Sequence, residues 1–264
     1  DCFTPDSETG RANLTLRNIT VARLEDRLKL QSSFDTIRRD LDTRGSIQAM
    51  DAYAQRAVQF VTSREFAQAL DISREPDRVR SRYGIGIGPT KTLGLQNARF
   101  LLARRLIESG ARCVNLTWEE GGARRWDTHE NNFKALRDEL LPPFDIGLSA
   151  FLDDLEVRGM IDDVLVLVWG EFGRTPRINN KAGRDHYAPA GSALLFGGGL
   201  KVGQVIGSTN RYGERPQDRP IQFQQVFATL YRHLGIDPAQ ATLLDPNNRP
   251  QYLLEHTDVI RELT

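Results

Sequence analysis

VLVLVWGEFGRTP, the sequence of residues 164–176, says more about the fold than any other stretch of this chain. Its first six residues are apolar and rich in β-branched valine, which is typical of a buried strand. The apolar run ends abruptly at Gly170 and Glu171, so the strand places a carboxylate at its C-terminal end. Ligands of open α/β sheets bind at this end of the strands. We therefore expect a binding site directly after Trp169.

Helical and strand-like patterns alternate around this strand. Apolar runs predict further strands over residues 113–118 and 192–196. Pro142 and Pro143 should break or kink one of the helices. The alternation is typical of an α/β fold in which helices flank a largely parallel sheet. Apolar residues at helical spacing predict helices over residues 95–110, 131–158 and 223–234.

The N-terminal part differs, because residues 16–70 carry apolar residues at helical spacing with no strand-like run. A further short helix is predicted over residues 71–82. We expect residues 1–90 to form a helical segment that packs on the core, and residues 91–264 to form an α/β domain with a metal site. Together the two parts should make one incomplete structural domain.

Composition excludes several classes of protein. The chain has 264 residues, of which 39% are hydrophobic and 27% charged, so it is neither disordered nor fibrous. Lys plus Arg equals Asp plus Glu at 35 each, and no overall charge favours nucleic acid. No apolar stretch approaches the roughly 20 residues that a membrane span needs. The start lacks both an initiator Met and a signal-peptide pattern, as expected for a processed or truncated chain.

The two cysteines, Cys2 and Cys113, stand in different contexts. Cys2 lies at the N-terminus, whereas Cys113 opens an apolar run. We expect no disulfide between them and interpret Cys113 as a small buried hydrophobic residue.

Asp127 and His129 form the first of three clusters of acids and imidazoles, just after the strand predicted at residues 113–118. In an extended loop, side chains two residues apart point to one side. The alternative is that Asp127 or Thr128 caps a helix starting near Asn131 while His129 is merely exposed. Taken alone, this segment favours the helix cap.

Glu171 and Arg174 form the second cluster, at the end of the strand quoted first. A guanidinium beside a carboxylate suits bidentate recognition of a tetrahedral oxyanion. Asn179 and Asn180 add neutral hydrogen-bond donors in the same loop. The alternative is an ordinary surface ion pair.

Asp185 and His186 form the third cluster. Loops often use such an Asp for a turn and leave the His in solvent. However, only four histidines exist, and two of them lie in these clusters. All three clusters should meet at one sheet edge, where mixed carboxylate and imidazole donors suit Zn, Mn or Fe. The predicted metal ligands are Asp127, His129, Glu171 and His186.

The motifs around these clusters resemble those of the DUF1501 family, bacterial proteins of unknown function placed near the alkaline phosphatase and sulfatase superfamily. The resemblance covers nearly the whole chain, which looks like the C-terminal portion of a family member. The motifs that carry it are NARFLLARRL at residues 97–106, WDTH at 126–129, GEFGRTP at 170–176, GRDH at 183–186 and GGG at 197–199.

The resemblance implies an alkaline-phosphatase-like sheet with metal ligands on the loops after its strands. Asp127 and His129 match an Asp-and-His ligand group, and His186 resembles a final ligand histidine. Glu171 stands where an Asp ends a central strand, whereas Phe172 departs from the pattern by replacing a histidine. The resemblance also implies a nucleophile in a preceding N-terminal half and export to a periplasmic or extracellular location.

These observations together predict a metal-dependent hydrolase that acts on phosphate or sulfate esters of a small molecule or polysaccharide. The ion would act as a Lewis acid. Glu171 and Asp185 would ligate a second ion or serve as general base, and Arg174 would stabilise the oxyanion. The predicted catalytic residues are thus Glu171, Arg174 and Asp185.

Two other functions remain open from the sequence. The first is a non-catalytic exported binding or scaffold protein that retains the fold, which Phe172 and the missing nucleophile segment favour. The second is a carbohydrate-binding module, which ranks last because Trp118, Trp126 and Trp169 lie near strand ends rather than in one exposed group.

Overall fold

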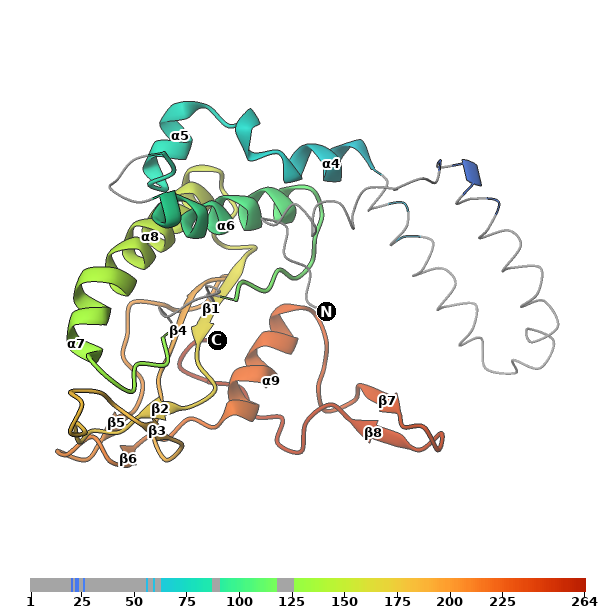
Figure 1. Ribbon diagram of the computed structural model, residues 1–264. Helices are drawn as coiled ribbons and strands as arrows, with labels where there is room; N and C mark the ends of the chain where they lie inside the picture. Colours follow the sequence, from blue (N-terminus) through green and yellow to red (C-terminus); the bar gives the residue numbers. More distant parts are fainter. Residues whose placement is uncertain are drawn as a thin grey trace. The chain divides into compact units, whose positions relative to one another are not determined.

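The computed structural model describes residues 63–86, 91–117 and 126–264, together with Thr20, Ala22, Arg23, Asp26, Arg56 and Gln59 (Figure 1). The chain divides into two units. The first is Asp1–Trp118 with Pro143–Phe151, and the second is Glu119–Pro142 with Leu152–Thr264. Most of the helical pattern predicted over residues 16–70 lies outside the described residues. The predicted division into residues 1–90 and 91–264 stays a prediction.

The first unit begins with helix α4 (Arg64–Leu70), which Ser63 caps by accepting a hydrogen bond from Phe66 N at 3.0 Å. The single helix predicted over residues 71–82 is instead split in two. The first part is the 3₁₀ turn η1 (Ile72–Arg74), and the second is helix α5 (Asp77–Arg82). Between them lies Glu75, whose ψ of 141° is extended. The reason is Pro76, because a residue that precedes proline is disfavoured in the helical region.

Helix α6 (Lys91–Glu108) confirms the helix predicted to end at Gly110. Gly110 adopts a φ of 104°, and Ala111 N donates to Leu106 O at 3.0 Å. These features close the helix in the way that glycine allows. Leu102 and Leu106 of α6 pack with Phe66 and Ala69 of α4 in one buried cluster.

Residues 113–117 are not the predicted strand, since they join no ladder among the described residues. Val114 of this segment packs against the cluster formed by α4 and α6. Cys113 is exposed, so its interpretation as a buried residue was wrong.

A buried ion cluster links these elements. Arg104 is only 1% exposed, and its guanidinium lies 2.9 Å from Glu75 Oε1 and 2.5 Å from Glu108 Oε2. Arg105 also pairs with Glu75 and donates from Nε to Ala69 O at 2.8 Å. Burial acts to raise the pKa of Glu75, but hydrogen bonds from Arg104 and Arg105 outweigh it and lower that pKa.

The first prediction concerns this cluster. Glu75→Gln should reduce the free energy of unfolding by about 3–5 kcal/mol, because it leaves buried guanidinium charge without its carboxylate. Because folding lowers the pKa of Glu75 from its ordinary 4.5, the loss should be full above pH 4.5 and shrink below it. Urea titrations at pH 7 and pH 3.5 measure both effects. Glu65→Gln, at an exposed position of helix α4, is the control, and an equal loss in both variants would contradict the prediction.

The predicted helix over residues 131–158 consists of α7 (Asn132–Lys134), the π-helical turn η2 (Ala135–Leu140) and α8 (Leu141–Val157). Pro142 and Pro143 do not interrupt it. They lie in the first turn of α8, where a missing N–H is tolerated. The helix changes its hydrogen-bond spacing at η2, immediately before the prolines.

The second unit confirms two predicted strands and corrects their pairing. Strand β1 (Leu165–Trp169) pairs with β4 (Ala193–Gly197), and the two run antiparallel with Leu167 opposite Leu195. The predicted parallel sheet was wrong for the described residues, which form four antiparallel sheets of two strands each. Residues 170–192 lack the helix that usually connects parallel strands, and the chain returns in the antiparallel direction. The other pairs are β2 (Gly173–Arg174) with β3 (His186–Tyr187), β5 (Ser208–Thr209) with β6 (Pro216–Asp218), and β7 (Thr242–Leu244) with β8 (Pro250–Tyr252).

Helix α9 (Phe223–His233) covers this pair of strands and confirms the predicted helix. Val226 packs with Ile260 and Leu263, and Leu167 of β1 and Leu195 of β4 contact the same cluster. Thus β1 is held from one side by a helix, and its C-terminal end leads directly into residues 170–192. Among the described helices, none is both long and apolar enough to cross a membrane.

Candidate metal centre

The hairpin of β2 and β3 builds one side of the site. Its register places Arg174 opposite His186, so their side chains emerge on one face. The loop next to the strands is closed by Thr175, whose N–H donates to Asp185 O at 2.9 Å and whose hydroxyl accepts from Asp185 N at 3.0 Å. The hairpin therefore presents a cation and an imidazole side by side.

Residues 126–132 build the other side and are bound to that loop by their backbone. Asn131 N donates to Lys181 O and Asn132 N to Ala182 O, each at 3.0 Å. A Cβ on Gly183 would lie 1.8 Å from the carbonyl oxygen of His129. This approach requires glycine, so two segments about 50 residues apart in the chain meet at backbone contact.

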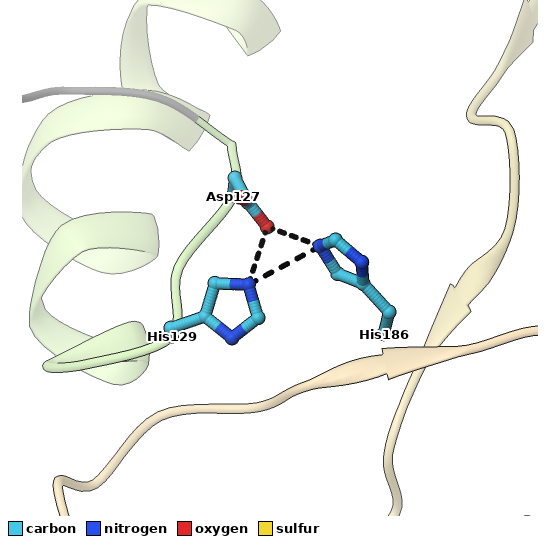
Figure 2. A group of neighbouring side chains, drawn as sticks. All are labelled: Asp127, His129 and His186. Carbon is cyan, nitrogen blue, oxygen red and sulfur yellow. Dashed lines mark hydrogen bonds and ion pairs between the residues drawn. The ribbon is translucent and has the colours of Figure 1, made fainter.

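Three ligand atoms converge where the segments meet (Figure 2). Asp127 Oδ1 lies 2.8 Å from His186 Nε2 and 3.0 Å from His129 Nε2, and the two imidazole nitrogens are 3.2 Å apart. Bonds of about 2.0–2.1 Å would place the ligands of a tetrahedral zinc ion about 3.3 Å apart, which is close to these separations. The side chains are 44–50% exposed, so water and a small ligand can reach them.

Asp185 orients one of these ligands. Its Oδ1 lies 2.8 Å from His129 Nδ1, so the carboxylate accepts the Nδ1 proton of a neutral imidazole. The lone pair of His129 Nε2 then faces Asp127 and His186. Asp127 Oδ1, His129 Nε2 and His186 Nε2 thus make three close contacts with one another. At most one hydrogen atom, the one on His186 Nε2, is available to bond them. A divalent cation satisfies all three atoms at once, so the donor set fits a metal ion.

The two carboxylates of the site are ionised at neutral pH. Hydrogen bonds from His186 and Arg174 lower the pKa of Asp127 to about 2, and the Arg174 nitrogen lies 2.5 Å from Asp127 Oδ1. Hydrogen bonds from His129 and Asn179 lower the pKa of Asp185. A carboxylate that is already deprotonated binds a cation without first releasing a proton.

The structure brings Asp127, His129 and His186 together but not every predicted ligand. Glu171 is exposed and lies outside the group that the described residues form. Asp185 contacts His129 Nδ1 and lies outside that group. Phe172 packs its ring 4.4 Å from the ring of His186. The described ligands therefore suit one ion.

One alternative and one part of the predicted site do not hold. Asn131 precedes α7 with a left-handed φ of 50° and no side-chain cap, so Asp127 is not a helix cap. Asn179 was interpreted as a donor to an oxyanion, but both of its donor contacts are to protein atoms. Sequence reasoning missed the positioning contact of Gly183, for which the only available signal is that glycine permits a close backbone approach.

The described residues thus define a protein of helices and short antiparallel hairpins with an Asp–His–His group that could hold a metal ion. The chain belongs to the DUF1501 family, described as a protein of unknown function, whose pattern matches residues 3–264. No curated protein and no solved structure matches it. The family membership predicted from the motifs is confirmed, and the relation to alkaline phosphatases and sulfatases stays a prediction.

The second prediction tests the backbone contact. Gly183→Ala should weaken zinc binding by about 10–100-fold, because the new methyl group forces the His129 backbone away from the loop. Isothermal titration calorimetry measures the affinity. Gly170→Ala is the matched control, since a Cβ there meets only Phe172 O at 3.6 Å. Unchanged affinity in Gly183→Ala would show that the site does not depend on this contact.

Proposed function

We propose that this protein is a divalent-metal-dependent hydrolase of phosphate or sulfate esters, with Asp127, His129 and His186 as ligands. The convergence of these three side chains, with the orientation of His129 set by Asp185, is the observation that carries the proposal. Structural metal sites are usually closed by four protein ligands, whereas catalytic sites keep a position open. Three half-exposed ligands suit the catalytic type.

A bound Zn, Mn or Fe ion would supply Lewis acidity toward an anionic ester oxygen and would make water more acidic. The chain's own contribution is to hold the ligands and the substrate. Arg174, fixed by β2 and paired with Asp127, offers a guanidinium for the anionic oxygens of the ester. Asp185 keeps His129 in the tautomer that binds metal. Glu171 has no ligand role in this proposal.

The choice of ester rests on the resemblance to alkaline phosphatases and sulfatases. Phosphate and sulfate monoesters are tetrahedral anions, which a guanidinium beside a cation recognises through charge and shape. The same resemblance supports an exported protein that meets a small-molecule or polysaccharide ester outside the cytoplasm. The substrate class and the location outside the cytoplasm are therefore both proposed from this resemblance.

A second candidate is a non-catalytic binding or scaffold protein. The observation that favours it is the ion pair of Arg174 with Asp127, which already neutralises one of the metal ligands. In that case the Asp–His–His group is a hydrogen-bonded network that joins the two segments. Metal content and ester hydrolysis separate the two candidates.

The third prediction is metal content. The protein purified after loading with Zn, Mn or Fe should hold about one ion per chain, because the described ligands suit one site. Asp127→Ala and His186→Ala should lose it, whereas His256→Ala, which removes an exposed histidine elsewhere, should keep it. Elemental analysis after exhaustive dialysis gives the answer. Protein without metal in every condition would exclude the proposed hydrolase.

The fourth prediction is catalytic. The loaded protein should hydrolyse 4-nitrophenyl phosphate or 4-nitrophenyl sulfate, and Arg174→Lys should lower kcat/KM by about 10–100-fold, because lysine keeps the charge but loses the planar fork. Arg177→Lys, in the same loop and exposed, is the control. A protein that holds its ion but cleaves neither ester would support the binding or scaffold candidate.

A further inference from the structure

Asn179 makes four hydrogen bonds with a single carboxamide. Its Nδ2 donates to the carbonyl oxygen of His129 at 2.9 Å and to Asp185 Oδ1 at 3.2 Å. Its Oδ1 accepts from Lys181 N and Gly183 N, both at 2.9 Å. A carboxamide offers two donors and two acceptor lone pairs, so the bonding capacity of this side chain is fully used.

The orientation of this amide follows from its neighbours. Two acceptors lie on one side of it and two backbone N–H groups on the other, so the reversed amide would place donor against donor and acceptor against acceptor. No other side-chain type of this size supplies two donors and two acceptors in that arrangement. Aspartate matches the shape of Asn179 but has no donor.

Asn179 joins the two segments that carry the metal ligands. One donor reaches the backbone of His129, and the other reaches the carboxylate that orients the imidazole of His129. Its acceptor side holds the turn at residues 181–183, in which Ala182 has a left-handed φ of 55°. The same turn accepts hydrogen bonds from the backbone N–H groups of Asn131 and Asn132. Asn179 therefore bonds to the loop, to His129 and to its orienting carboxylate.

We propose that Asn179 is a positioning residue for the metal centre, which holds Asp185 against His129 Nδ1 and thereby aims His129 Nε2 at Asp127 and His186. The inference rests on the proposed function insofar as the aimed nitrogen serves a metal ion. The orientation of His129 is itself a property of the protein without metal. Asn179 acts through other residues and does not contact the ion or the substrate.

The test compares three variants of the full chain at pH 8, where a free imidazole is neutral. Asn179→Asp keeps the shape but turns two donors into acceptors that face His129 O and Asp185. Asn179→Ser can still accept from the backbone N–H groups of the turn but is too short to reach His129. Asn180→Asp adds the same charge at the adjacent exposed position and is the matched control.

Zinc affinity, measured by calorimetry, should fall by about 10–100-fold in Asn179→Asp and Asn179→Ser and stay within about twofold in Asn180→Asp. Long-range ¹H–¹⁵N spectra of the metal-free protein should show His129 as the Nδ1–H tautomer in the unaltered chain and in Asn180→Asp. The tautomer should change in the Asn179 variants. A merely structural role would not move this signature in a folded protein.

Unaltered affinity together with an unaltered His129 spectrum in a folded Asn179→Ser protein would overturn the inference. If Asn179→Asp does not fold, Asn179→Ser alone decides. If the unaltered chain binds no metal, the proposed function fails, and the His129 spectra still decide the role of Asn179. A loss of affinity in Asn180→Asp as large as in Asn179→Asp would assign the effect to charge alone and would also overturn the inference.

Discussion

The hydrogen bond between Asp185 and His129 Nδ1 is the contact on which the candidate site depends. Without it, either nitrogen of His129 can carry the proton, and Nε2 is as able to donate as to accept. With it, Nε2 presents a lone pair to Asp127 and His186. A group of polar side chains becomes a set of ligands only when the proton positions are defined in this way, and a carboxylate behind the imidazole is the usual means.

The antiparallel pairing of β1 with β4 determines where this contact can form. In a parallel sheet, the loop after β1 would lead into a crossover helix, and the acids of successive loops would line one edge. Here the same 23 residues, 170–192, leave β1 and return as β4, so they are free to fold as the small hairpin of β2 and β3. The site consequently lies within one long connection and the segment that precedes α7. The site still begins at the end of β1. Its ligands, however, are positioned by a hairpin and not by the edge of a sheet.

Much of the local structure could be predicted from the sequence, because it depends on short-range physics. The apolar run of β1, the stripe of α9 and the glycine after α6 each specify an element through neighbours a few residues away. The clustering of Asp127, His129 and His186 was predicted from their residue types and positions after apolar runs. The direction of strand pairing could not be predicted, because an apolar run is compatible with both a parallel and an antiparallel pair.

The roles of the polar side chains depended on contacts that no short window contains. Asp185 and Asn179 are 56 and 50 residues away from His129, and only the fold shows that one orients its ring and the other its backbone. Glu171 was predicted as a ligand because it ends a strand, yet the chain bends at Glu171 and Phe172, and it is Arg174 and His186 of the following hairpin that contact Asp127. The end of a strand predicts the approximate region of a site, whereas the geometry of its ligands depends on which side chains contact one another.

Arg174 gives the site its balance of charge. Asp127 and Asp185 bring two negative charges, and the guanidinium at 2.5 Å from Asp127 Oδ1 offsets one of them. A divalent cation bound by this group would have ligands of net negative charge, but one of them, Asp127, is already paired with the Arg174 guanidinium. A metal ion bound to Asp127 would compete with Arg174 for that carboxylate, and the N–H groups of the Arg174 guanidinium would then be available to an anionic ligand. Under the proposed function, cation binding and anion binding would therefore favour one another, because a cation that displaced Arg174 from Asp127 would free the donor that an ester anion requires.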